Sequence, residues 1–220
     1  MNADPGPGRL VCELSGVSAG YRRDVDVLTG VDLRVPHGCT LLTGPNGSGK
    51  STVVELVAGT LRPSRGSVTV LGLPASTPEL RSRRTVCRAT PALYPALTVS
   101  EHVSLLEIDP GSFAERAGRY GLARWLDTPV HGLSTGNVRK AWLLLTTGAP
   151  GELLVLDEPF NGLDPQGVGA LAGDIDTWMA TGCSVTVVAH EPPEVFRDLV
   201  EVTIRIAGPG LPEPAGTGPR

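Results

Sequence analysis

The stretch TGPNGSGKST, residues 43–52, constrains the fold of this chain more than any other segment. Glycines at positions 44 and 49, followed by Lys50 and Ser51, have the spacing of a phosphate-binding loop. An apolar, β-prone run at 39–43 precedes the loop, and residues 50–58 have helical spacing that ends at a glycine. This order of strand, loop and helix favours an α/β core that binds phosphate over a glycine-rich surface turn.

The residue types of the loop suit an anion. Glycines let backbone N–H groups surround a phosphate at a helix N-terminus, Lys50 adds a positive charge, and Ser51 offers a hydroxyl to Mg²⁺. Lys50 is one of only two lysines among 19 basic residues, the other being Lys140. We expect the whole loop to line the site: Gly44, Pro45, Asn46, Gly47, Ser48, Gly49, Lys50, Ser51 and Thr52.

A second group of functional residues follows the apolar run at 153–156. The run is typical of a buried parallel strand, and Asp157 stands at its carboxyl end, where open α/β sheets place their ligand sites. A carboxylate there can hold Mg²⁺, and Glu158 beside it can accept a proton from an attacking water. Alone, Asp-Glu-Pro after a strand is more often a capped turn. Together with the phosphate loop, it favours a metal ligand and a general base.

A third apolar run, residues 183–189, ends before His190. A histidine in such a place is usually a structural or solvent-facing residue. Its position at the same sheet edge would let it reach a terminal phosphate, and we favour that role.

The remaining sequence indicates a single domain at 10–206, with loose Pro- and Gly-rich ends at 1–9 and 207–220. Apolar runs are too short to span a membrane and the start lacks a secretory signal, which predicts a cytoplasmic protein. The net charge of −4 is spread over the chain, and no basic run predicts nucleic-acid binding. Four cysteines lie too far apart for a zinc motif and are expected to be reduced packing residues: Cys12, Cys39, Cys87 and Cys183.

Four motifs in order give the chain a resemblance to the nucleotide-binding domains of ABC transporters across residues 10 to 206. They are the phosphate loop GPNGSGKST, the signature LSTGN, the strand LLVLDEP with its following NGLD, and the switch VVAH. Tyr21 matches the aromatic residue on which this family stacks adenine. The resemblance looks strongest to bacterial exporters with a single domain per chain.

The signature turn has two interpretations. As an ordinary helix start, Ser134 would be the N-cap. The resemblance implies more: the Ser134 hydroxyl and the Gly136 backbone would face the γ-phosphate held by a second ATP-binding subunit, in a head-to-tail homodimer or heterodimer. It also implies ATP and Mg²⁺ as ligands, separate transmembrane permease subunits as partners, and a location on the inner face of the cell membrane.

Three features depart from the family pattern. Ala89 occupies the position of a glutamine that the family uses near Mg²⁺ and the attacking water, and Gln166 is the only glutamine in the chain. Asn137 replaces the commoner glutamine of the signature. The segment between Thr98 and Leu133 is short and is interrupted by Asp-Pro-Gly, so that only one full helix is expected there.

Two functional classes therefore stay open. An ATP-hydrolysing transporter subunit is favoured by the complete set of Lys50, Asp157, Glu158 and His190. The alternative is a regulatory or weakly hydrolysing subunit, suggested by Ala89. ABC ATPases that act on ribosomes or DNA fit less well, because they usually have paired domains or a long coiled-coil insertion.

The predicted fold class follows from the same residues. It is α/β: a P-loop NTPase core with a mainly parallel sheet, an antiparallel β subdomain that includes residues 66–72, and an inserted, shortened helical subdomain at about 90–148.

Overall fold

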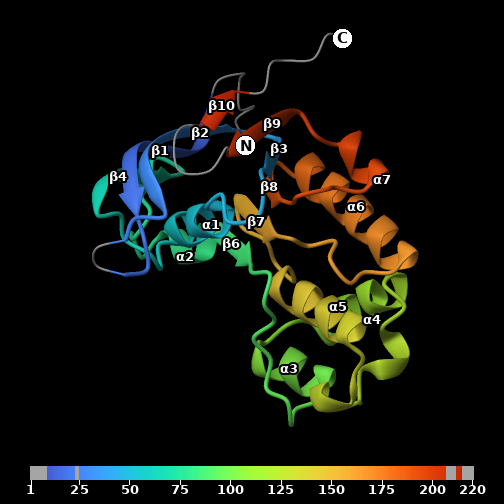
Figure 1. Ribbon diagram of the computed structural model, residues 1–220. Helices are drawn as coiled ribbons and strands as arrows, with labels where there is room; N and C mark the ends of the chain where they lie inside the picture. Colours follow the sequence, from blue (N-terminus) through green and yellow to red (C-terminus); the bar gives the residue numbers. More distant parts are fainter. Residues whose placement is uncertain (1–8, 23–24, 207–211, 215–220) are drawn as a thin grey trace.

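A computed structural model describes residues 9–22, 25–206 and 212–214. The predicted loose ends at 1–9 and 207–220 lie almost entirely outside the described residues. In the described part, two sheets and two groups of helices build an α/β architecture (Figure 1). The predicted fold class is confirmed.

The smaller sheet is antiparallel, with strand order β2-β1-β4-β5. One face of β2 is buried and the other exposed, since Val31, Leu33 and Val35 alternate with the exposed Asp32 and Arg34. This period of two is expected of a sheet with one face in the core. The strands are β1 (Leu10–Ala19), β2 (Leu28–Pro36), β4 (Arg65–Val70) and β5 (Leu73–Pro74).

The larger sheet has the order β10-β9-β3-β8-β7-β6 and is parallel except at β10, which pairs antiparallel with β9. All five residues of β7 and of β8 are buried, as expected for strands covered on both faces. The strands are β3 (Cys39–Thr43), β6 (Arg84–Cys87), β7 (Leu153–Asp157), β8 (Ser184–Val188), β9 (Val202–Ile206) and β10 (Pro212–Pro214).

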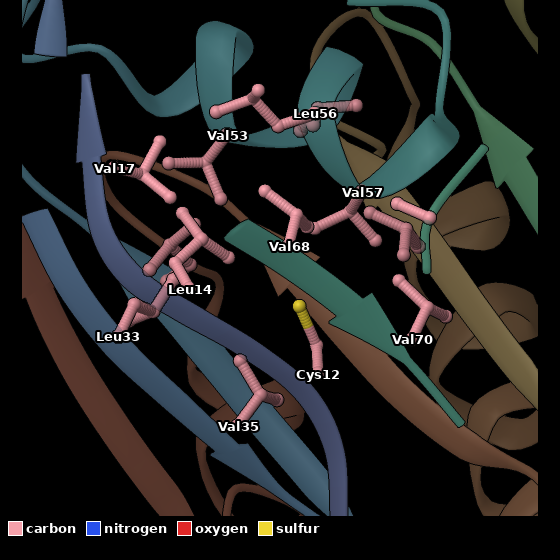
Figure 2. Packing of buried hydrophobic residues seen from close by; sticks show 14 of the residues in the cluster. Cys12, Leu14, Val17, Leu33, Val35, Val53, Leu56, Val57, Val68 and Val70 are labelled. Carbon is pink, nitrogen blue, oxygen red and sulfur yellow. The ribbon is translucent and has the colours of Figure 1, made fainter. Parts of the chain in front are cut away.

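Helix α1 (Lys50–Ala58) packs against the antiparallel sheet. Val53, Leu56 and Val57 of this helix lie over Leu14 and Val68 of the sheet (Figure 2). The same helix α1 also packs on one face of the parallel sheet, through Leu153 and Val155 of β7. Helix α6 (Pro165–Ala180) covers the opposite face of that sheet, where its apolar residues share a second core with β7 and β8. Two short helices complete the core: α2 (Leu80–Arg83) and α7 (Glu194–Arg197). Packing on both faces holds the parallel strands rigid, which fixes the positions of their carboxyl ends.

A helical lobe projects from the core as the green and yellow helices at the bottom of Figure 1. It contains α3 (Val99–Leu105), α4 (Pro110–Arg119), short 3-10 turns at Ala123–Trp125 and Val130–Gly132, and α5 (Thr135–Thr146). The expectation of only one full helix between Thr98 and Leu133 is wrong, because Asp-Pro-Gly separates α3 from a second helix, α4, and begins it. Asp109 is the N-cap of α4, accepting a hydrogen bond of 2.7 Å from the Ser112 amide, and Pro110 occupies the first turn. Proline lacks an N–H, so it suits a helix start, where that donor has no partner.

A buried carboxylate links the helical lobe to the core. Asp174 of α6 accepts hydrogen bonds from Arg116 (2.8 Å) and from the Tyr120 hydroxyl (2.9 Å), and pairs with Arg119 at 2.6 Å. Burial and the nearby Asp174 charge raise the pKa of Tyr120 far above its ordinary value, so the phenol remains a donor. This network fixes one end of the lobe against α6.

The four cysteines are buried and free, which confirms the prediction of reduced packing residues. Burial is the main reason why their thiol pKa values are raised. Across the three described ranges, no helix combines the length and apolar character needed to cross a bilayer.

Candidate functional site

Three adjacent parallel strands end at one edge of the larger sheet, and each is followed by a predicted functional segment. In the register, Leu42 of β3 and Asp157 of β7 both pair with Val188 of β8. Just beyond that level, the Ala189 amide donates to the Leu42 carbonyl at 3.1 Å, and the Glu158 amide donates to the Val188 carbonyl at 2.8 Å. The sheet order therefore brings the phosphate loop, Asp157, Glu158 and His190 to one edge.

The phosphate loop has a backbone that only glycine accommodates at two places. Gly44 has φ of +153°, and a Cβ there would meet the Ile206 carbonyl oxygen. Gly49 has φ of +97°, and a Cβ there would meet the Leu28 side chain. The loop backbone thus lies so close to Ile206 of β9 and Leu28 of β2 that no side chain fits at these two positions.

Lys50 begins α1 and lies across the loop. Its Nζ donates to the carbonyl oxygens of Gly44 (2.8 Å) and Pro45 (3.0 Å), and the residue is only 8% exposed. No carboxylate of the described residues is bonded to this buried ammonium, so the position favours an anion. Within the described chain, the buried Ser48 hydroxyl has no hydrogen-bond partner either, so it is a second donor available to a phosphate. Ser51 is exposed on the first turn of α1, while Thr52 is buried.

Asp157 is 5% exposed, and among the described residues its Oδ1 has no hydrogen-bond partner. Burial raises the pKa of Asp157, and the Glu158 charge adds to the rise. The Ala89 backbone amide and the charges of Arg139 and Lys50 lower that pKa by smaller amounts. A buried carboxylate oxygen without a donor fits a hard divalent cation, and the exposed Ser51 hydroxyl has the matching oxygen chemistry.

Glu158 has a left-handed backbone, with φ of +48°. Such a conformation is uncommon outside glycine and costs free energy, so surrounding contacts must hold it. Glu158 is partly exposed, and its carboxylate accepts a long hydrogen bond of 3.4 Å from the side-chain amide Nδ2 of Asn161. The carboxylate borders an open cleft of about 630 Å³, which Ala89, Leu133 and Thr135 also line. A cleft of this kind gives Glu158 access to solvent.

His190 and Tyr21 are placed less tightly. His190 follows β8, its side chain is exposed, and its carbonyl lies 3.4 Å from the Thr43 hydroxyl at the end of β3. Tyr21 is 62% exposed and follows β1. Their predicted contacts with the γ-phosphate and with adenine stay predictions.

The signature turn is the start of α5. Ser134 is its N-cap and accepts a hydrogen bond of 3.2 Å from the Asn137 amide, as the sequence predicts. A Cβ on Gly136 would lie 3.0 Å from the Gly162 carbonyl, so the turn approaches the segment that follows Glu158. The role of Ser134 and Gly136 toward a phosphate on a second subunit stays a prediction.

Two charged residues of α5 have connecting roles that sequence reasoning missed. Lys140 is buried and its Nζ lies 2.7 Å from Asp164, the N-cap of α6. Arg139 is also buried and donates to the carbonyl of Glu158 at 2.6 Å. One signal was available in the sequence: both residues stand one helical turn before leucines, Leu143 and Leu144, and therefore on the apolar face of α5.

The glycine-rich loop between β3 and α1, with Asp157 and Glu158 at the neighbouring strand end, defines the class of a phosphate-loop nucleotide-binding domain. Residues 28–161, more than half of the chain, match the family model described as ABC transporter. The chain belongs to the ABC transporter family, as one of its ATP-binding subunits.

Curated relatives agree with this assignment. A putative ABC transporter ATP-binding protein of Streptomyces coelicolor is 32% identical over 208 residues, covering 87% of this chain and 72% of that protein. A zinc import ATP-binding protein of Alkalilimnicola ehrlichii is 35% identical over 196 residues, covering 85% and 71%. A cytochrome c biogenesis ATP-binding export protein of Gluconobacter oxydans is 32% identical over 190 residues, covering 86% and 84%.

Solved structures give the same fold. One described as the ATP-binding subunit of an ABC transporter superposes with a TM-score of 0.78 at 26% identity, covering 90% of this chain and 86% of that one. A nucleotide-free ATP-binding cassette superposes with a TM-score of 0.72 at 20% identity, covering 90% and 88%. The second match supports the fold alone.

Proposed function

We propose that this chain hydrolyses ATP and thereby powers transport through separate membrane-spanning subunits. The proposal depends on three residues that converge at one sheet edge. Among the described residues, the Lys50 ammonium is bonded only to carbonyl oxygens and Asp157 Oδ1 has no donor, while Glu158 borders an open cleft. These are the charge, the metal ligand and the base that phosphoryl transfer to water requires.

In the proposed reaction, the backbone amides between Gly44 and Thr52 bind the phosphates, and Lys50 exchanges its two carbonyl partners for phosphate oxygens. Ser51 and Asp157 would hold Mg²⁺, which would supply positive charge against the negative charge of the terminal phosphates. Glu158 orients a water molecule and accepts its proton as the water oxygen bonds to the γ-phosphorus. The bond from that phosphorus to the bridging oxygen of ADP breaks, so that ADP and phosphate are the products. His190 donates to the γ-phosphate, and Tyr21 supports the adenine ring.

The proposal includes a head-to-tail dimer. Ser134 and Gly136 begin an exposed helix N-terminus, whose partial positive charge suits a phosphate. We assign this half-site to the nucleotide of a second ATP-binding subunit, identical or homologous. Closing and opening of the dimer would move the membrane partners, which select the cargo and keep the chain at the inner membrane face. Curated relatives include one named for import and one named for export, so we assign the direction of transport to the membrane partner as well.

The alternative is a regulatory subunit that binds ATP and turns over poorly. Ala89 favours it, because its methyl group lines the cleft beside Glu158 where the family has a glutamine. The two proposals differ in steady-state phosphate release from saturating MgATP, measured with the membrane partner present.

Replacing Glu158 with Gln tests the base. Phosphate release should fall about 10²- to 10⁴-fold, the range for losing a general base, while ATP affinity is retained. The ATP-bound variant should sediment as a dimer. Glu115→Gln, a change at an exposed glutamate of α4, is the matched control and should hydrolyse at the parental rate. Parental turnover in Glu158→Gln would remove Glu158 as the base.

A further inference from the structure

Arg139 lies on the second turn of α5 and is only 5% exposed, although it is charged. Burial lowers its pKa, and the charges of Cys87, Asp157 and Glu158 act in the opposite direction. Its hydrogen-bond partners are all backbone carbonyl groups, and they belong to two segments that are far apart in the sequence. A buried guanidinium costs free energy, so its geometry must serve a purpose that an apolar residue would not.

The contacts divide evenly between the two segments. Nη1 donates to the carbonyl of Arg88 at 3.1 Å and to that of Ala89. Nη2 donates to the carbonyl of Asp157 at 2.9 Å and to that of Glu158 at 2.6 Å. One planar group therefore joins the loop after β6 to the end of β7.

The second pair of contacts fixes the backbone of Glu158. The φ and ψ angles of a residue are set by the peptide planes on its two sides. Arg139 holds the carbonyl of each plane, and the Glu158 amide is held by Val188 at 2.8 Å. Together these hydrogen bonds stabilise the left-handed conformation of Glu158, with φ of +48°, which is unfavourable for a glutamate on its own.

We propose that Arg139 is a positioning residue, which holds Glu158 in its productive backbone conformation and couples that conformation to the Ala89 loop. The expected effect on catalysis rests on the proposed function. The coupling of the Glu158 backbone to the Ala89 loop does not. The Ala89 methyl group lines the cleft but carries no polar group of the kind that a glutamine would bring there. The backbone carbonyl of Ala89 makes the link instead, through Arg139, so that a movement of the loop reorients Glu158.

The chain contains a matched control for this chemistry. Arg84 also binds backbone carbonyls, those of Val57 (2.6 Å), Ala58 (2.5 Å) and Ala75 (3.0 Å). These carbonyls lie at the C-terminal end of α1 and just after β5, and not at the carboxyl ends of β3, β7 and β8 where the candidate site lies. Arg84 and Arg139 therefore make the same type of hydrogen bond, from a guanidinium to backbone carbonyls, but they bind different segments of the chain.

The first experiment compares Arg139→Met and Arg139→Lys with Arg84→Met and Arg84→Lys. Arg139→Met should lower kcat about 10²-fold, the effect of small misplacement of a reacting group, with the ATP Kd changed less than threefold. Arg139→Lys, which keeps the charge but loses the planar fork, should recover about a tenth of the parental kcat. Both Arg84 variants should lower Tm and leave kcat unchanged below the melting range. Parental kcat in folded Arg139→Lys, or equal losses of kcat in the two series, would overturn the proposal.

Amide hydrogen exchange supplies a readout independent of turnover. In Arg139→Lys, segments 88–91 and 157–161 should lose protection together, while the Arg84 variants should affect only residues near 57–60 and 75. Continued protection of 157–161 alongside a loosened 88–91 would contradict the coupling. If the parent releases no phosphate, the proposed function fails while this measurement still decides the role of Arg139.

Discussion

The helices α1 and α5 both begin at predicted phosphate contacts, but their first turns are built differently. Before α1 stands Gly49, with φ of +97°, and within the described chain no side chain caps the helix. Before α5 stands Ser134, whose oxygen accepts the Asn137 amide at 3.2 Å. The first helix leaves its N–H groups to an anion, whereas the second satisfies one of them from its own sequence.

The difference shows that Ser134 can cap its own helix and also remain available to a phosphate. A hydroxyl both accepts and donates, so Ser134 can cap α5 through its lone pair and still direct its proton outward. The α1 end, in contrast, depends on its ligand, because Lys50 and Asp157 are both buried and neither is bonded to an opposite charge among the residues that the structure describes. We therefore expect substitutions at the α1 end to affect binding within the same chain, and those at α5 to affect turnover in the partner.

The largest expected effect tests the α1 end. Lys50→Ala should weaken ATP binding by about 10² to 10³, since each hydrogen bond between charged groups contributes about 1.5–3 kcal/mol. A titration with ATP and Mg²⁺ measures it. Lys140→Ala changes the only other lysine and should leave the ATP Kd unchanged. Equal affinity in Lys50→Ala and the parent would refute the site assignment.

At the α5 end, Ser134→Arg should retain ATP binding but lower phosphate release by about 10² or more, because a bulky side chain blocks the signature turn. Ser104→Arg, at an exposed serine of α3, is the matched control. Mixing Ser134→Arg with Lys50→Ala subunits should restore one working site per heterodimer. A mixture no more active than either parent variant would count against a site shared between subunits.

The comparison also predicts stability changes of opposite sign. Ser134→Ala removes an N-cap and should lower the free energy of unfolding by about 1 kcal/mol. Asp157→Asn removes a buried charge and should raise it by about 1 kcal/mol in the absence of nucleotide and Mg²⁺. Burial raises the Asp157 pKa in the folded protein above the ordinary value of 3.8 that applies to the unfolded chain. The free energy of unfolding therefore falls as pH rises above 3.8, because the unfolded chain loses this proton more readily than the folded protein does. The gain from Asp157→Asn should therefore grow as pH rises above that value, in urea titrations; a gain independent of pH would contradict this origin.

The smallest effect concerns Ala89, which lies between the two ends. Ala89→Gln should change basal phosphate release only about two- to threefold if the chain already works, since it would add one contact to a complete site. A degraded subunit would instead gain about 10² or more from a recovered electrostatic contact. Ala92→Gln places the same side chain at an exposed position in the same loop, so it controls for any effect of a glutamine in this loop that does not depend on position 89. Negligible parental turnover with a hundred-fold gain in Ala89→Gln would favour the regulatory alternative.

Much of the site could be predicted because its parts are local. The loop 43–52 specifies its own strand, turn and helix, and Asp157 follows an apolar run whose burial on both faces the residue types predict. Ser134 as N-cap is likewise a matter of a few adjacent residues. The number of helices in the lobe was mispredicted. Asp109 and Pro110 were interpreted as a break alone, but they also have the pattern of a helix start.

The sequence by itself determined the class of fold, the phosphate loop and the carboxylates at a strand end, since propensity, periodicity and capping act over a few residues. Only the tertiary structure decided that β8 lies between β3 and β7, that Asp157 Oδ1 is buried without a donor among the described residues, and that Arg139 joins Ala89 to Glu158. These contacts connect residues as much as 50 positions apart. The spacing of Arg139 to Leu143 could indicate that Arg139 is buried, but its partners are backbone carbonyls, which every residue carries, so the sequence could not identify them.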